Sequence, residues 1–307
     1  GLGDVYKRQN NNRMKELTAK RAVPALPVAG SFRSIDFALS SMSNSHIQTV
    51  AVLTQYNARS LNEHLSSSKW WNFGRKQGGL FLFTPTVTAD NSDWYRGTAD
   101  AMYQNIDFLK RRHEPYVIIS SGDCVYKLDF NRVLDFHIEK KSDITVVCKD
   151  MMYNDDVSRF GVVRMDDESR ITEFDEKPIE ASSNTISTGI YVIRRRQLIE
   201  LLEAAAEENR FDFVNDILVR YKNVKKIYGY KINSYWNNIA DIDAYFKTNM
   251  DFLRPDIRSY FFREEPTICS KVDDLPPAKF NPGSDISNSL VSSGCIINGS
   301  VEDSVLF

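Results

Sequence analysis

Short runs of apolar, often β-branched residues alternate with longer stretches of helical spacing along the first half of the chain. Residues 47–54, 116–120 and 143–148 have the length and composition of buried strands. The stretches with apolar residues at helical spacing are 58–65, 98–110 and 130–140. Because parallel neighbours need a crossover connection, this alternation predicts an α/β fold with a doubly wound parallel sheet, which binds ligands beyond the carboxyl ends of its strands.

The second half of the chain begins with a predicted hairpin and later loses its helical pattern. The hairpin strands are predicted at 160–164 and 171–174, with a polar turn between them. Two further helices are expected at 200–209 and 241–252. The pattern changes after Pro255, and four prolines between positions 259 and 283 break it further.

Residues 286–307 place apolar side chains among Ser, Asn and Gly with a period near six, which is typical of the hexapeptide coils of a β-helix. One or two coils fit into this stretch, whereas a solenoid normally needs about three or more repeats to bury its core. We therefore expect either that this stretch is the truncated start of such a domain or that this end of the chain packs on something else. Residues 1–9 fit neither a strand nor a targeting signal and are excluded from the fold prediction.

The charge balance argues against a general polyanionic partner. Lys and Arg number 39 against 41 for Asp and Glu, so the net charge of −2 attracts neither nucleic acid nor an anionic membrane. No apolar run approaches the roughly 18 residues of a membrane span, and no signal-peptide layout opens the chain, so we expect a cytoplasmic location. The four cysteines and four histidines are scattered, which gives no metal-ligand spacing.

Two motifs lie where the predicted fold would bind a ligand. Asp123 follows a buried strand, so its carboxylate can hold a magnesium ion at phosphates, although such an Asp more often caps a turn. Gly97 permits close backbone approach, and Thr98 is a candidate N-cap whose helix offers free amides to an anion. An ordinary capped helix is the alternative there.

Basic residues provide two further candidate phosphate contacts. Lys177 stands before Pro178, which favours an extended backbone and suits a lysine aimed at a phosphate, although a solvated loop charge is more common. The first 33 residues contain a loose cluster of basic residues of the kind that a triphosphate needs. Charges at this density are, however, usually just part of the solvated surface. The members of the cluster are Arg13, Lys20, Arg21 and Arg33.

A dense series of segments resembles the ADP-glucose pyrophosphorylase, or glucose-1-phosphate adenylyltransferase, family from about residue 12 to 307. These segments are KRAVPALPVAGSFRSIDFALS (20–40), VLTQY (52–56), WYRGTADAMYQN (94–105), SGDCVYKLDF (121–130), EKP (176–178), STGIYV (187–192), FDFVNDIL (211–218), LPPAKF (275–280) and SLVSSGCIINGSVEDSVLF (289–307). The resemblance implies a nucleotide-diphospho-sugar transferase (Rossmann-like) domain at 1–254. It implies the linker and first coils of a left-handed β-helix at 255–307.

The resemblance also implies a reaction, in which glucose 1-phosphate attacks the α-phosphorus of ATP to give ADP-glucose and pyrophosphate. Asp123 and Arg13 would serve catalysis, Asp123 would hold Mg²⁺ together with position 238, and Lys177 would bind the sugar phosphate. The expected adenine and ribose contacts are Gln55, Tyr95, Gly97 and Thr98, and the expected glucose contacts are Ser187, Asp216 and Trp236.

Three departures from the family pattern weaken the implied catalysis. The family's glycine-rich phosphate loop is represented by QNNNRM at 9–14, Val23 replaces a lysine, and Asn238 replaces a second magnesium-binding aspartate. Losing one preorganised charge partner typically costs about 100-fold or more in rate. Magnesium is therefore expected to bind weakly or to depend on a partner chain.

This pattern is similar to the regulatory, non-catalytic subunit that some bacteria pair with a catalytic one in glycogen synthesis, so a hetero-oligomer, expected as a tetramer, is predicted. Two alternatives stay open. The chain is an active adenylyltransferase if Asp241 or Asp243 takes the role of Asn238. It is a purely structural assembly subunit if it binds neither glucose 1-phosphate nor ADP-glucose.

Overall fold

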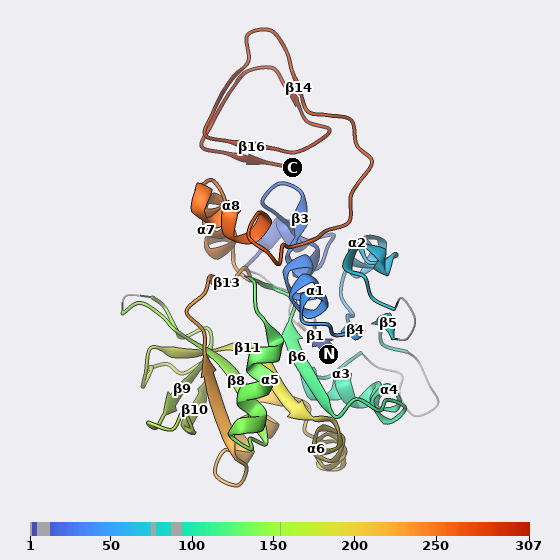
Figure 1. The fold of residues 1–307 in the computed structure, drawn as a ribbon, viewed down its shortest axis with the longest axis vertical. Coiled ribbons are helices and arrows are strands. Elements are labelled where there is room, and N and C mark those ends of the chain that lie inside the picture. The colour runs from blue at the N-terminus through green and yellow to red at the C-terminus, as the bar shows by residue number, and fades with distance from the viewer. Residues whose placement is uncertain (1, 5–12, 75–77, 87–93, 154) are drawn as a thin grey trace.

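The computed structural model describes residues 2–4, 13–74, 78–86, 94–153 and 155–307 of the 307-residue chain. Within these residues, one sheet of nine strands has helices on both faces (Figure 1). Its strands are β1 (Leu2–Asp4), β4 (Thr49–Leu53), β5 (Gly79–Phe83), β6 (Tyr116–Ser121), β8 (Ile144–Asp150), β9 (Gly161–Met165), β10 (Ile171–Glu176), β11 (Thr185–Arg194) and β12 (Ile227–Lys231). The helices are α1 (Ser34–Asn44), α2 (Arg59–His64), α3 (Thr98–Gln104), α4 (Ile106–Lys110), α5 (Phe130–Glu139), α6 (Arg195–Glu207), α7 (Ile242–Asp251) and α8 (Pro255–Phe262).

The predicted α/β alternation and the predicted hairpin β9–β10 are confirmed, but the sheet is mixed rather than parallel. Strands β5, β4, β1 and β6 are parallel neighbours, as are β8 and β12. Strand β11 runs antiparallel between β6 and β8. The reason is the connection, because β11 follows β10 through residues 177–184, which contain no crossover helix.

The exclusion of residues 1–9 as non-strand was wrong at its start. Leu2–Asp4 form β1, which is parallel to β4 on one side and to β6 on the other. Three residues are too few to carry a readable periodicity, so only pairing on both edges reveals this strand. The remainder of that segment, 5–9, and the loop counterpart at 9–12 lie outside the described residues.

Alternate residues of the central strands enter two separate cores, one on each face of the sheet. Val50 and Val52 of β4 pack with α1, α2 and α5, whereas Ala51 and Leu53 pack with α3, α4 and α6. This period-two division is what two covered faces require. The predicted helix at 98–110 is broken at Asn105, whose side-chain amide donates to the Ala101 carbonyl (2.9 Å).

A third core lies beside the sheet, where α7 and α8 pack against α1. Phe261 of α8 meets Phe37 edge-on with ring centroids 5.3 Å apart, and Phe252 at 5.4 Å. No helix was predicted after Pro255, yet α8 begins there. Proline at the first helical position loses no hydrogen bond, so it starts this helix instead of breaking one.

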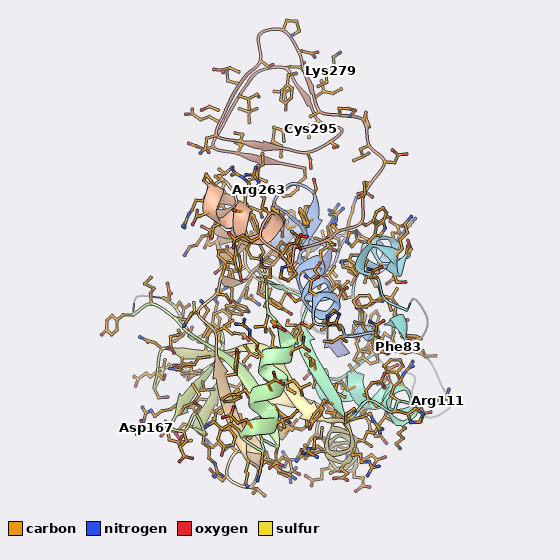
Figure 2. All side chains as sticks on the ribbon, in the orientation of Figure 1. Phe83, Arg111, Asp167, Arg263, Lys279 and Cys295 are labelled. Carbon is orange, nitrogen blue, oxygen red and sulfur yellow. The ribbon has the colours of Figure 1, made fainter. Side chains whose placement is uncertain are left out.

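The C-terminal residues form a coil whose three sides are short parallel pairs. These are β14 (Lys279–Phe280) with β17 (Ile296–Ile297), β15 (Asp285–Ser287) with β18 (Ser300–Glu302), and β16 (Leu290–Val291) with β19 (Val305–Leu306). Figure 2 shows side chains filling the space around the sheet, while those near Lys279 and Cys295 stand apart from it. The coil contacts the hairpin of β2 (Pro27–Val28) and β3 (Phe32–Arg33), where Ser292 donates to the Gly30 carbonyl.

Candidate functional site

A cavity of about 930 Å³ opens beyond the carboxyl end of β6, where ligands of such sheets bind. Nine of the eleven residues predicted for the site line it, namely Arg13, Gly97, Thr98, Asp123, Lys177, Ser187, Asp216, Trp236 and Asn238. Gln55 and Tyr95 are not among the lining residues, and the Gln55 side chain accepts a hydrogen bond from the Tyr95 amide (2.8 Å). The fold therefore brings most of the predicted residues together at one cavity. The role of each residue there stays a prediction.

Asp123 and Asn238 are brought together by the short antiparallel pair β7 (Cys124–Tyr126) and β13 (Trp236–Asn238). Asn238 lies opposite Cys124, and its side-chain amide donates to the Cys124 sulfur (3.4 Å). Its side-chain oxygen accepts from the Ala240 amide (3.0 Å). The buried Asp123 carboxylate accepts from the Ser121 hydroxyl. One carboxylate beside a neutral, hydrogen-bonded amide does not fit a firmly held Mg²⁺, which relies on a few carboxylates and the substrate's phosphates.

Arg159 is a cavity residue that the sequence analysis missed. Its guanidinium pairs with Asp241, and the side chain is 26% exposed. Burial and then the nearby Arg13 lower the pKa of Arg159, against the opposing charges of Asp156 and Asp243. The two guanidiniums therefore lie within electrostatic reach of each other at one end of the cavity.

Asp241 is already committed to two structural contacts. One of its oxygens accepts from the Ala244 amide (2.8 Å), which makes Asp241 the N-cap of α7, and the other pairs with Arg159. Val23 is 7% exposed and lies in the aromatic third core, not along the cavity. Val23, which the sequence analysis expects to replace a lysine of the family, is thus packed among other apolar side chains.

The prediction that Thr98 caps α3 and leaves amides for an anion was wrong. The N-cap is Gly97, and the Phe211 carbonyl accepts from the Ala99 amide (2.8 Å) and the Asp100 amide (3.3 Å). The Thr98 hydroxyl accepts from the Phe213 amide (2.8 Å). A loop 113 residues further along the chain therefore occupies this helix start, which local sequence cannot reveal.

The Lys177 backbone is not extended, contrary to the prediction from Pro178. Its φ is +50°, in the left-handed region that costs a side-chain-bearing residue about 1–2 kcal/mol. The Lys177 amide donates to the Phe160 carbonyl (3.1 Å), which continues the β9–β10 ladder and holds this turn. The Lys177 ammonium is 3.3 Å from the carboxylate of Glu176, which also lines the cavity. Burial raises the pKa of Glu176 above its ordinary value, and the charge of Lys177 offsets part of this increase.

Hydroxyl and indole groups line the cavity as well. Ser187 is buried and donates to the Tyr191 hydroxyl (3.3 Å), and burial raises the pKa of Tyr191 above its ordinary value. Trp236 is 3% exposed, and its Nε1 has no hydrogen-bond partner among the residues that the structure describes. Neutral donors of this kind suit a polyhydroxyl ligand, because a buried N–H without an acceptor is costly to leave unmade.

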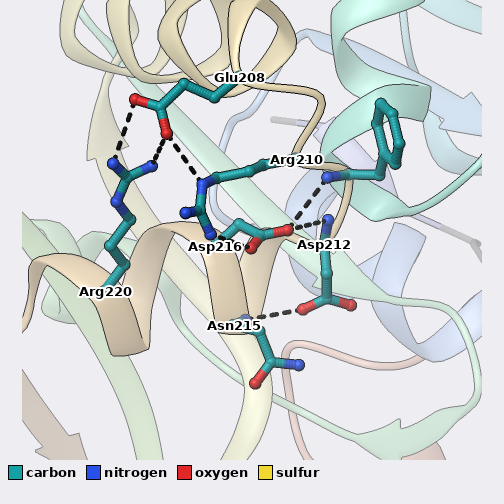
Figure 3. A network of polar contacts seen from close by, with 7 residues as sticks. Glu208, Arg210, Asp212, Asn215, Asp216 and Arg220 are labelled. Atoms are coloured by element: carbon teal, nitrogen blue, oxygen red, sulfur yellow. Dashed lines mark hydrogen bonds and ion pairs between the residues drawn. The ribbon is translucent and has the colours of Figure 1, made fainter.

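Asp216 belongs to a polar network that holds the loop 208–213 (Figure 3). Its carboxylate accepts from the Phe211 amide (3.0 Å) and the Asp212 amide (2.9 Å), and pairs with Arg210 at 3.3 Å. Asp212 itself lines the cavity. The sequence carried a signal for Glu176 and Asp212, because both lie inside segments that resemble the family, but none for Arg159, a lone arginine in a loop.

Among the described residues, no helix combines the length and the apolar character needed to cross a membrane. A family model described as nucleotidyl transferase matches residues 10–254. The chain is 38% identical over 298 residues to the glucose-1-phosphate adenylyltransferase of Clostridium novyi (strain NT), covering 96% of this chain and 78% of that protein. Proteins of the same name from Clostridium acetobutylicum and Geobacillus stearothermophilus are 39% and 36% identical over 299 residues each, covering 96% of this chain and 78% and 77% of theirs.

Proposed function

We propose that this chain, which belongs to the glucose-1-phosphate adenylyltransferase family of nucleotidyl transferases, binds the substrates of that reaction but turns them over weakly or not at all by itself. In this reaction an oxygen of glucose 1-phosphate displaces pyrophosphate from the α-phosphorus of ATP. The protein contributes mainly positioning and charge neutralisation. A chain that retains the first contribution and lacks much of the second serves as a regulatory subunit for glycogen synthesis.

The observation that carries this proposal is the neutral Asn238 amide opposite Cys124, next to Asp123. Magnesium draws its affinity from a few carboxylates and the substrate's phosphates, so one carboxylate fewer weakens it. The Asn238 oxygen is also engaged by the Ala240 amide. The alternative in which Asp241 substitutes for the missing carboxylate loses support, because Asp241 caps α7 and pairs with Arg159.

The binding side of the proposal rests on the groups that remain at the cavity. Lys177 offers a charge for the sugar phosphate, and Trp236 offers an unused buried donor. Glu176 and Asp212 add acceptors for hydroxyl groups. We infer that glucose 1-phosphate or ADP-glucose binds there with Mg²⁺ held weakly or only with a partner chain.

The direct test is to restore the carboxylate with Asn238→Asp. We expect adenylyltransferase activity of the lone chain at saturating Mg²⁺ to rise by up to about 100-fold, since one preorganised charge partner is returned. ADP-glucose formation by the isolated chain measures this. The matched control is Asn131→Asp, an exposed position on α5 away from the cavity, which leaves the activity unchanged.

Adding Val23→Lys is a harsher variant, because it places an ammonium in the apolar third core. The proposal is wrong if the unmodified chain by itself forms ADP-glucose as fast as it does together with a catalytic partner.

Calorimetry with glucose 1-phosphate and ADP-glucose tests the alternative of a purely structural subunit, for which no heat of binding is expected.

The proposal has three further parts, which concern the C-terminal domain, the oligomer and the location in the cell. The parallel pairs of the C-terminal coil support the start of a left-handed β-helix, whose handedness and full extent stay proposals. A hetero-oligomer with a catalytic subunit, expected as a tetramer, follows from the regulatory role. A cytoplasmic location fits the substrates of this reaction.

A further inference from the structure

The loop 208–213 is the wall that joins two sides of the cavity. At Phe211 its carbonyl accepts from the first amides of α3, and its ring lies under the Arg96 guanidinium at 3.9 Å. At Asp212 it brings a carboxylate within electrostatic reach of Glu176 and Tyr191. A shift of this loop therefore moves both sides of the cavity together.

A chain of alternating charges runs through the wall, from Arg220, which does not line the cavity, to Asp216, which does (Figure 3). Arg220 donates to both oxygens of Glu208, at 2.5 and 3.1 Å, and Glu208 accepts from Arg210 at 2.9 Å. Arg210 in turn pairs with Asp216 at 3.3 Å. The hydrogen bonds from Arg220 and Arg210 lower the pKa of Glu208, which keeps this link charged.

The Asp216 carboxylate, at the inner end of the chain, is occupied by protein groups. One oxygen accepts both the Phe211 and Asp212 amides, and the other accepts from Arg210. Two amides and a guanidinium account for three of the roughly four acceptor sites of a carboxylate. Asp216 is therefore better placed to fix the wall than to take a sugar hydroxyl.

We propose that Asp216 is a positioning residue and that the chain Arg220–Glu208–Arg210–Asp216 sets the affinity of the cavity for a hexose phosphate through the wall 208–213. Arg220 does not line the cavity, so its influence on a ligand has to pass through the wall. This inference rests on the proposed function for the identity of the ligand. The hold on the wall does not depend on it.

The test removes the outermost link with Arg220→Gln and uses two readouts. Without ligand, we expect amide exchange at 211–213 to become about threefold faster, because exposed ion pairs are individually weak. With glucose 1-phosphate, calorimetry should give a Kd weaker by a similar factor of about three. Arg220→Lys should recover part of both effects.

The matched control is Arg254→Gln, which removes another arginine that donates to both oxygens of a carboxylate, here Asp256, away from the cavity. It should change neither readout. A double-mutant cycle adds Glu208→Gln, and Arg220→Gln should then have little further effect, since its partner is already gone.

Unchanged exchange at 211–213 in Arg220→Gln overturns the proposal, and so does faster exchange with an unchanged Kd. If the unmodified chain takes up no glucose 1-phosphate, the proposed function fails. The exchange readout then decides separately whether the charge chain holds the wall.

Discussion

His137 of α5 is a buried titratable side chain with one ring nitrogen bonded. Its Nδ1 lies 2.8 Å from the Thr145 hydroxyl, and the ring packs edge-on against Tyr116. Nε2 has no hydrogen-bond partner within the part of the chain that the structure describes. Burial, assisted by Arg194 and opposed by Asp143, lowers the pKa of His137 to about 4. The folded protein therefore keeps this imidazole neutral.

A depressed pKa in the folded state makes stability depend on pH in a defined direction. The unfolded chain takes up a proton near pH 6.5, while the folded chain resists it until about pH 4. Stability is thus complete above the unfolded value and falls as the pH drops through this window. Between pH 7 and 5, His137 should account for a loss of about 2 kcal/mol in the free energy of unfolding.

Urea unfolding of His137→Gln at pH 7 and pH 5 measures this contribution. We expect the variant to be less stable at pH 7 but to lose about 2 kcal/mol less than the unmodified chain on acidification. His113→Gln, at an exposed position, should keep the pH dependence of the unmodified chain. An identical pH dependence in His137→Gln would contradict the assignment.

At the level of elements, the start of α3 packs directly on the wall 208–213 through Gly97. The φ of Gly97 is −178°, an extended angle that any residue adopts, so its backbone needs no glycine. A Cβ at this position would instead lie 2.1 Å from the Phe211 carbonyl oxygen and 2.6 Å from its carbon. The absence of a side chain is what lets the helix end and the wall meet.

Gly97→Ala should therefore push the wall away from α3. Because the obstructing atoms are backbone, we expect a loss of about 1–3 kcal/mol in unfolding free energy, together with weaker glucose 1-phosphate binding. Chemical denaturation and calorimetry measure the two effects. Gly299→Ala, where an added Cβ meets nothing within 4 Å, should stay within about 0.5 kcal/mol of the unmodified chain.

Sequence reasoning predicted the elements whose pattern of apolar and polar residues can be read within a single short segment of the chain. Strands β4, β6 and β8 are apolar on both faces, and Asp123 lies two residues after the end of β6. Strand β1 is too short to show a pattern, and the antiparallel course of β11 depends on partners far along the chain. The occupied start of α3 is another such case, because Phe211 comes from a distant loop.

At the scale of the whole molecule, the segment that links α8 to the C-terminal coil is tied across α1. The Ser40 hydroxyl donates to the Cys269 carbonyl (3.1 Å) and accepts from its amide (2.9 Å). Trp71 also donates to that carbonyl (3.2 Å), and Asn44 donates to the Thr267 carbonyl (3.0 Å). These contacts make the residues just after α8 a strap over the first half of the chain.

The sequence predicts that the nucleotidyl transferase domain ends at residue 254. The aromatic third core and this strap indicate instead that the residues just after 254 stabilise that domain. Ending the chain after residue 254 removes Phe261, which is fully buried between Phe37 and Phe252. Losing a buried Phe typically costs about 3–5 kcal/mol, a large share of the stability of a domain. Ending it after residue 270 keeps α8, the aromatic contacts and the strap.

We therefore expect the 1–270 fragment to unfold cooperatively and the 1–254 fragment to be less stable by about 3 kcal/mol or more. Thermal unfolding monitored by near-ultraviolet circular dichroism compares the two, because the clustered aromatic rings report on the third core. Adding Ser40→Ala to the 1–270 fragment removes both hydrogen bonds to Cys269 and should cost about 1–3 kcal/mol, since one hydrogen bond typically contributes about 0.5–1.5 kcal/mol. Equal stability of the 1–254 and 1–270 fragments would show instead that α8 belongs with the C-terminal coil, as the boundary at 254 predicts.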